Sequence, residues 1–125
     1  MYKRILIPTD GSEVAHKGVA AGIAYAREAG AKVISLEEHE RQSAATANSI
    51  LERATQAVRD AGVDFQTDHA LNDHPWEAIV EAARKHGCDA IIMGSHGRKA
   101  LSRLFHGSQA IDVLTHSDLP TLVVR

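Results

Sequence analysis

Three glycines and a serine have the residue types and spacing of a phosphate-binding loop: Gly94, Gly97, Gly107 and Ser108. Glycines let backbone N–H groups turn toward a phosphate, and a helix beginning near residue 107 would direct its positive dipole end at the same anion. The segment from Ala90 to Ile111 contains no acidic residue, but it contains Arg98, Lys99, Arg103 and two histidines. A plain glycine turn on a solvated basic surface would show the same pattern, so both interpretations stay open at this point.

A second loop whose residues could bind a ligand follows the first apolar run: Pro8-Thr9-Asp10-Gly11-Ser12. Asp10 could accept hydrogen bonds from a ligand's amino or hydroxyl groups, or hold a Mg²⁺ ion that bridges phosphates. Gly11 would allow a close approach of backbone or ligand. The alternative is a turn and helix cap, in which Asp10 or Ser12 accepts backbone N–H groups.

Five apolar segments are expected to position these loops as strands. Near-continuous runs at residues 5–7, 90–93 and 121–124 are typical of strands covered on both faces, as in a parallel sheet. Two weaker candidates are residues 32–36 and 63–67, and the alternation in the second predicts a strand at or near an edge. The second strand is expected to end at Leu36, because Glu37, Glu38 and His39 follow at once.

Helical periodicity fills the gaps between these strands. It predicts helices over residues 12–30, over 44–61, from Pro75 onward, and over 108–115 with Ile111 and Leu114 facing inward. The alternation of strands and helices predicts a doubly wound parallel sheet with right-handed crossovers. Ligands of such sheets bind beyond the carboxyl ends of the strands, which is where both loops would lie.

Composition restricts the class of protein further. The 125 residues, 44% hydrophobic, suffice for one domain but not for two. A formal net charge of -2 argues against a polybasic binder of nucleic acid or of a membrane surface. The N-terminal apolar run is too short for a signal peptide, and no window reaches the roughly 18 apolar residues of a membrane helix, so a cytoplasmic location is expected. Cys88, the only cysteine, lies beside an apolar run and is expected to be buried.

Several familiar sites are excluded by the sequence. There is no Gly-x-x-x-x-Gly-Lys-Ser/Thr loop, and no Gly-x-Gly-x-x-Gly follows the first strand. Ser95 and His96 are neighbours but lack the context of a nucleophile elbow, and the eight histidines show no tight metal-site spacing. A phosphoacceptor receiver domain would need a lysine after the fifth strand, which this chain lacks. We therefore expect neither catalytic residues nor a metal site of the protein's own.

The whole chain resembles the universal stress protein family. The resemblance rests on the opening residues 5–12, on residues 91–97 and on the ending residues 119–124. The nucleotide-binding branch of that family has the pattern Gly-x2-Gly-x9-Gly-Ser/Thr, which Gly94, Gly97, Gly107 and Ser108 match with both spacings intact.

This resemblance implies a single domain over residues 1–125 that binds ATP, with Mg²⁺ as a possible companion. The implied fold is a five-stranded parallel sheet in the order 3-2-1-4-5 with helices on both faces, like that of the adenine-nucleotide α-hydrolases. Family members are often homodimers that pair their last strands, here Pro120 to Arg125. The residues implied for the nucleotide site are Pro8, Thr9, Asp10, Met93, Gly94, His96, Gly97, Arg98, Gly107, Ser108 and Gln109.

The chain departs from the family pattern after the second strand. The end of that strand normally packs on the adenine ring, whereas here Glu37 or Glu38 is expected at that place, which would weaken adenine binding or change the base preference. The leading hypothesis is a nucleotide-regulated stress-response factor. The alternatives are a nucleotide-free dimeric scaffold that works through protein partners, motivated by this acidic segment, and a slow ATPase.

Overall fold

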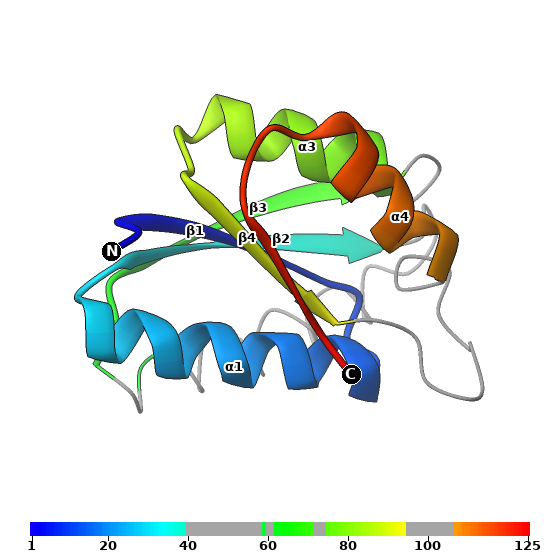
Figure 1. The fold of residues 1–125 in the computed structure, drawn as a ribbon. Helices are drawn as coiled ribbons and strands as arrows, with labels where there is room; N and C mark the ends of the chain where they lie inside the picture. The colour runs from blue at the N-terminus through cyan, green and yellow to red at the C-terminus, as the bar shows by residue number, and fades with distance from the viewer. Residues whose placement is uncertain (40–58, 60–61, 72–74, 95–106) are drawn as a thin grey trace.

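The structure contains the predicted parallel sheet. In the computed structural model we describe residues 1–39, 59, 62–71, 75–94 and 107–125. The five strands lie in the order β3-β2-β1-β4-β5, which confirms the expected fold class and places β3 at an edge, as its alternating sequence predicted (Figure 1). The strands are β1 (Arg4–Thr9), β2 (Lys32–His39), β3 (Phe65–Leu71), β4 (Ala90–Gly94) and β5 (Thr121–Val124). The helix predicted over residues 44–61 lies largely outside the described residues.

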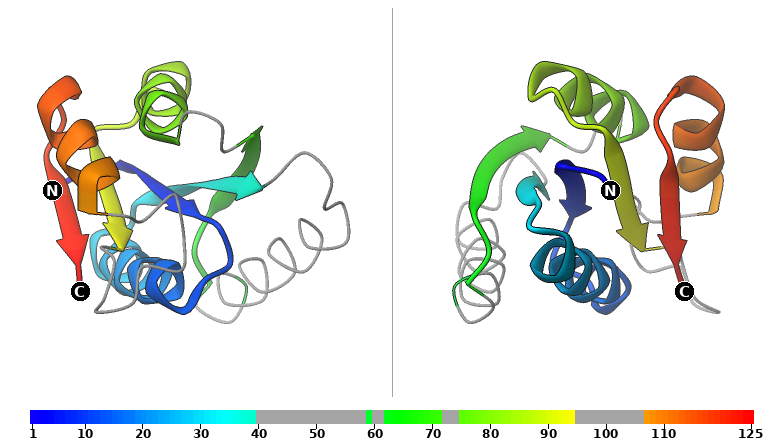
Figure 2. Two further views of the ribbon diagram at one scale, coloured as in Figure 1. Left: turned by 90° about the vertical axis from the view of Figure 1, so that its right-hand side faces the viewer. Right: turned by 60° about the vertical axis from the view of Figure 1, so that its left-hand side comes forward.

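Helices cover both faces of the sheet. The helix α1 (Glu13–Ala29) lies on one face, whereas α3 (Pro75–Lys85) and α4 (Gly107–His116) lie on the other (Figure 2). Helix α1 begins at Ser12, whose hydroxyl accepts the Ala15 N–H, and ends at Gly30 with a φ of 68°, a left-handed conformation that suits glycine. None of the helices in the described ranges is long and apolar enough to cross a membrane.

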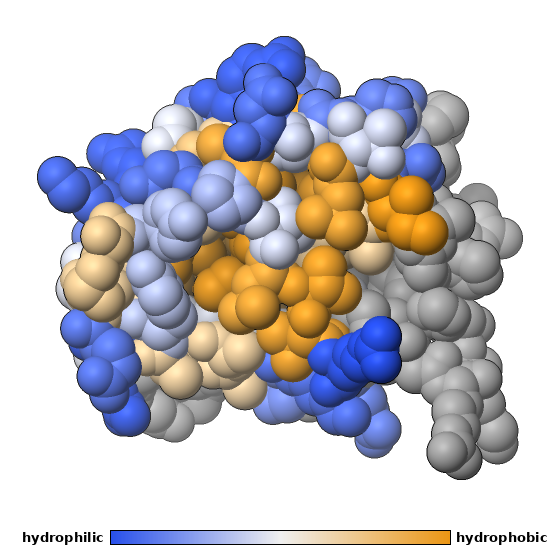
Figure 3. Space-filling model, in the orientation of Figure 1, coloured by the Kyte–Doolittle hydropathy of each residue, from blue (hydrophilic) through white to orange (hydrophobic). Residues whose placement is uncertain are grey.

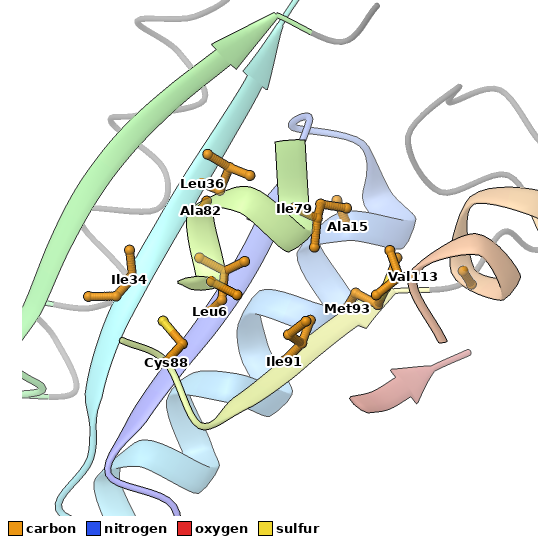
Figure 4. Close-up of a cluster of buried hydrophobic side chains, with 12 residues drawn as sticks. Leu6, Ala15, Ile34, Leu36, Ile79, Ala82, Cys88, Ile91, Met93 and Val113 are labelled. Carbon is orange, nitrogen blue, oxygen red and sulfur yellow. The ribbon is translucent and has the colours of Figure 1, made fainter. Parts of the chain in front are cut away.

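Alternation along the strands divides the core in two. Ile5, Ile7 and Val33 point toward α1, while Leu6, Ile34 and Ile91 point toward α3 and α4. Figure 4 shows the second cluster, in which Ile79 of α3 and Val113 of α4 close over the sheet and the buried Cys88 thiol fills one end, as predicted. Two covered faces explain why the central strands read as continuous apolar runs.

Three details predicted from the sequence differ from the structure. The strand expected at residues 63–67 is β3 at Phe65–Leu71, so it begins two residues later and ends four residues later. Strand β2 does not end at Leu36 but continues through Glu37 and Glu38 to His39, because β3 pairs with it along this whole length. Helix α4 is rotated from the expected phase: Ala110 and Val113 face inward, whereas Ile111 and Leu114 are 62% and 51% exposed. The apolar stripe of α4 is thus partly on the surface.

Helices α3 and α4 are joined by an aromatic contact. The rings of Trp76 and His116 stack with centroids 4.1 Å apart and an interplanar angle of 23°. His116 lies in the last turn of α4, and its Nδ1 donates to the carbonyl of Asp112 at 2.8 Å. Together with the burial of Val113, this stack fixes the helix whose other end begins at Gly107.

The position of α1 on the sheet depends on Gly18. A Cβ atom at this position would lie 2.6 Å from the backbone N of Gly94 and 3.0 Å from the carbonyl carbon of Met93. Backbone atoms of a buried strand cannot move aside, so only glycine lets the helix lie this close to the end of β4. Gly22 differs, because its Cβ would meet the flexible end of the Ile7 side chain.

We therefore expect Gly18→Ala to destabilise the fold more than Gly22→Ala. The first substitution pushes α1 from β4 and should lower the free energy of unfolding by about 2 kcal/mol, despite the better helix propensity of alanine. The second requires only a rotation of Ile7. Urea unfolding of both variants measures the difference, and equal losses would contradict a backbone contact at Gly18.

Candidate functional site

The carboxyl edge of the sheet opens between β1 and β4. Strand β1 pairs with β2 over six residues, but with β4 only at Ile5↔Ala90 and Leu6↔Ile91. The chain proceeds from β1 to one side of the sheet and returns to the other side with β4, so this is the point where the strand order reverses. Ligands of doubly wound sheets bind at this point.

The loop after β1 is held by its own side chains. The Thr9 hydroxyl accepts the Gly11 N–H at 3.2 Å, and Asp10 Oδ1 accepts the Ser12 N–H at 3.0 Å. Gly11 has a φ of 82°, the left-handed region in which a side chain would be strained. The loop therefore forms the turn and helix cap of one interpretation, which leaves the ligand interpretation untested. Pro8 and Thr9 are buried, and Asp10 is partly exposed.

The end of β4 and the start of α4 frame the other side of this edge. Met93 is fully buried in the core beneath α4, and Gly94 ends the strand against α1. Gly107, Ser108 and Gln109 form the first turn of α4, in which there is no acidic residue. The expected site residues His96, Gly97 and Arg98 lie outside the described residues.

Strand β2 brings two buried carboxyl groups to the same edge. Glu37 and Glu38 are both 0% exposed, and because they are neighbours on a strand they point to opposite faces. Glu37 shares the α1 face with Thr9 and accepts the Ser35 hydroxyl at 2.9 Å. Glu38 shares the α3 and α4 face with Leu36. Among the described residues, neither oxygen of Glu38 has a hydrogen-bond partner, and Oε2 of Glu37 has none.

Burial changes the ionisation of both groups. Loss of water raises the pKa of Glu37 to about 7, although the hydrogen bond from Ser35 works in the opposite direction. Burial and, to a lesser extent, the negative charge of Asp10 together raise the pKa of Glu38 to about 9. Glu38 is therefore a neutral carboxylic acid at neutral pH, placed within electrostatic reach of the β1 loop.

The sequence alone draws attention to these two glutamates but not to their environment. Acidic residues after an apolar run usually mark the end of a strand. The strand was therefore expected to end at Leu36, and the two glutamates were expected in the loop that follows. Only the seven-residue pairing of β2 with β3 shows that the strand continues through them. No residue pattern within β2 predicts that pairing.

Other possible chemistry is limited. In the parts of the chain that the structure describes, no group of three or more His, Cys, Asp or Glu side chains could hold a metal ion. Asp68 on β3 contacts His86 Nε2 at 2.7 Å and Lys85 Nζ at 3.4 Å, a pairing that ties the edge strand to the end of α3. The switch point beside β1 is thus the candidate site.

Fold and topology together define a doubly wound α/β protein with a candidate ligand edge at the ends of β1 and β4. The universal stress protein family model matches residues 1–125, so the chain belongs to the universal stress protein family. A universal stress protein of Thermus aquaticus is 31% identical over 137 residues, with both chains covered in full.

Solved structures agree with this assignment. The structure of MJ0577 from Methanocaldococcus jannaschii is 30% identical, with a TM-score of 0.82, and the match covers 99% of this chain and 96% of that one. A universal stress protein in complex with cAMP is 25% identical, with a TM-score of 0.83, and the match covers 99% and 97% of the two chains.

The buried glutamates predict a pH-dependent stability. Their pKa values in the folded state exceed the 4.5 of an ordinary glutamate, so the folded protein retains protons that the unfolded chain releases. Their contribution is complete at and below about pH 4.5 and is lost as the pH rises toward about 9. Glu38→Gln should reduce the loss of stability between about pH 5.5 and 8.5 by up to about 4 kcal/mol, one proton over three pH units.

Urea unfolding at a series of pH values measures this slope. Glu28→Gln, which neutralises an exposed carboxylate on α1, is the matched control and should leave the slope unchanged. A Glu38→Gln profile parallel to that of the wild type would show that Glu38 is ionised in the folded protein.

Proposed function

We propose that this protein binds ATP at the edge between β1 and β4 and acts as a nucleotide-regulated stress-response factor. The observation that carries the proposal is the intact glycine and serine spacing at Gly94, Gly97, Gly107 and Ser108 in a member of this family. The similarity to a universal stress protein in complex with cAMP supports an adenine nucleotide as the ligand.

The described residues fit the two ends of such a ligand. The first turn of α4 offers the N–H groups of Gly107, Ser108 and Gln109 to phosphates, with the helix dipole behind them. Gly97, His96 and Arg98 complete the phosphate contacts in this proposal. Asp10, with Pro8 and Thr9, takes the ribose side, and its carboxylate is the group that could hold Mg²⁺ against the phosphates. Met93 and Gly94 form the floor between the two ends.

The protein is also proposed to be a homodimer that pairs its β5 strands. Strand β5 is an edge strand, and Leu122 on it is 54% exposed. Apolar side chains gather on the face that carries β5 and α4, where Ile111 and Leu114 are exposed (Figure 3). A sheet edge that no described strand covers, flanked by exposed apolar side chains, favours the pairing of two copies across a two-fold axis.

A nucleotide-free scaffold is the second candidate function. The acidic end of β2 motivates it, because Glu37 and Glu38 lie where the resemblance leads us to expect an apolar contact with the base. Native mass spectrometry of protein released from its own host separates the two functions. A mass increment equal to a nucleotide supports the first proposal, and protein that carries none supports the scaffold.

Gly107→Asp should abolish nucleotide binding without loss of the fold. A carboxylate at the start of α4 would occupy the phosphate position and repel the ligand, which should weaken binding by about a hundredfold or more. Gly97→Asp should act in the same way. Calorimetric titration with ATP and Mg²⁺ measures the affinity, and circular dichroism checks the fold.

The matched control for these variants is Ala24→Asp, which adds the same charge on the exposed side of α1. It should bind as the wild type does. An absence of wild-type binding at millimolar ATP would exclude the proposed function, and equal binding by Gly107→Asp would exclude the start of α4 as the phosphate site.

Leu122→Lys should convert the proposed dimer into a monomer. The substitution places a charge at the centre of the β5 edge, where edge strands use lysine to prevent pairing. Sedimentation of the variant should give the mass of one chain. Tyr2→Lys, which replaces another exposed apolar side chain on the N-terminal segment before β1, should remain dimeric. A dimeric Leu122→Lys variant would contradict the proposed edge.

A further inference from the structure

The first turn of α1 is tied to the loop after β1. The Ser12 N–H donates to Asp10 Oδ1 at 3.0 Å, and the Ser12 hydroxyl accepts the Ala15 N–H at 3.1 Å. The Ser12 carbonyl also accepts the His16 N–H at 2.9 Å, the first bond of the helix. A residue that caps a helix in this way fixes the direction in which the chain enters it. The position of Asp10 therefore follows the position of α1.

The next turn of α1 lies against the end of β4. Gly18 is buried there, and a Cβ atom at this position would lie 2.6 Å from the backbone N of Gly94 and 3.3 Å from the Cα of Met93. Ala15, in the preceding turn, is fully buried in the core cluster that includes Met93 and Val113 of α4 (Figure 4). One helix is thus in contact with the β1 loop, the end of β4 and the core beneath α4.

We propose that Gly18 positions the two borders of the nucleotide site relative to each other, with the Ser12 cap passing the position of α1 to Asp10. This inference rests on the proposed nucleotide site. Gly94, which lies against Gly18, is the first glycine of the spaced set, and Asp10 is the proposed partner of the ribose. Neither Gly18 nor Ser12 touches the ligand in this proposal. A ligand that contacts both borders binds well only if their separation is held to within about 0.5 Å.

The absence of a side chain at Gly18 permits this separation. Ordinary contact of a Cβ atom begins at 3.4 Å, whereas the Cβ of an alanine here would lie 2.6 Å from Gly94, about 0.8 Å too close. The end of β4 is held in place, because β5 pairs with it through Met93 and Gly94 and the Met93 side chain is fully buried. Helix α1 is therefore the element that moves, and it takes the Ser12 cap and Asp10 with it.

Gly22, one turn further along α1, is the matched control for the substitution of glycine by alanine. Its Cβ would meet the end of the Ile7 side chain, which rotates away and belongs to the core beneath α1. Alanine raises the helix propensity equally at both glycines. An effect of the helix itself would therefore appear in both variants, whereas a shift of the site borders would appear only at Gly18.

Val33 is the control for lost stability. It is buried at the start of β2, where it pairs with Ile5 and packs against the α1 face at the end of the sheet opposite the candidate site. Val33→Ala leaves a cavity in this core and lowers the stability of the fold. Because the cavity is far from Asp10 and Gly94, it should leave the borders of the site where they are.

The test is calorimetric titration of ATP and Mg²⁺ into the wild type and these variants, under conditions in which circular dichroism shows each protein folded. Gly18→Ala should bind ATP about tenfold or more weakly than the wild type, because its two borders no longer match the ligand. Gly22→Ala and Val33→Ala should bind as the wild type does. A role confined to stability would not change the affinity of the folded protein.

The outcomes separate this inference from the proposed function. A Gly18→Ala variant that binds ATP as tightly as the wild type overturns the positioning role but leaves the nucleotide site intact. A Val33→Ala or Gly22→Ala variant that loses as much affinity as Gly18→Ala overturns that role too, because the loss would then follow stability or helix propensity. A wild type that does not bind ATP at any concentration up to millimolar overturns the nucleotide site and this inference with it.

A second pair of variants tests the same link from its other end and does not depend on the folding of Gly18→Ala. Ser12→Ala removes the hydroxyl that joins the β1 loop to α1, and it should weaken ATP binding by about fivefold. Ser12→Thr keeps a capping hydroxyl and should bind as the wild type does. Wild-type affinity in Ser12→Ala, or an equal loss in Ser12→Thr, would overturn the inference.

Discussion

The short pairing between β1 and β4 is the constraint on which the site depends. Their backbone hydrogen bonds end at Leu6 and Ile91, while both strands continue beyond this point. The contact of Gly18 with the backbone of Gly94 then holds the end of β4 against α1. β1 and β4 pair with each other only at their amino ends, while β1 continues beside β2 and β4 beside β5. Their carboxyl ends therefore leave an open edge between them. A side chain at residue 18 would move one border of that edge.

Burial, more than sequence charge, decides the electrostatics of this edge. Glu37 and Glu38 would bring two negative charges to the ends of the strands if both were ionised. Instead, the loss of water raises both pKa values, and the long pairing of β2 with β3 keeps the two side chains inside the fold. Ser35 satisfies one oxygen of Glu37, so that group has a partner within its own strand. Glu38 has no comparable partner among the described residues, and its burial keeps it protonated at neutral pH.

The sequence was sufficient for features that depend on local chemistry. Continuous apolar runs located the central strands, Ser12 and Gly30 located the ends of α1, and Pro75 located the start of α3. The errors arose where tertiary contacts override local pattern. Pairing with β3 extends β2 through two glutamates, and the contact of α4 with the core selects Ala110 and Val113 over the larger Ile111 and Leu114. Hydrophobicity cannot choose between two apolar stripes on one helix, because that choice depends on what lies opposite each of them. Nothing in the described residues tests His96, Gly97 or Arg98, so these remain predictions from the glycine spacing.

A neutral Glu38 also resolves a conflict within the proposed site. A triphosphate is strongly anionic, and three ionised carboxylates at Asp10, Glu37 and Glu38 would oppose its approach. With Glu38 protonated, the negative charge near Asp10 falls, while the acid-free first turn of α4 would receive the phosphates of the proposed ligand. The near-neutral formal charge of the chain conceals this division, because it averages a basic segment from Ala90 to Ile111 with acidic residues elsewhere. Substitution of Glu38 by an ordinary apolar residue would remove the same repulsion, so charge alone does not require an acid at this position.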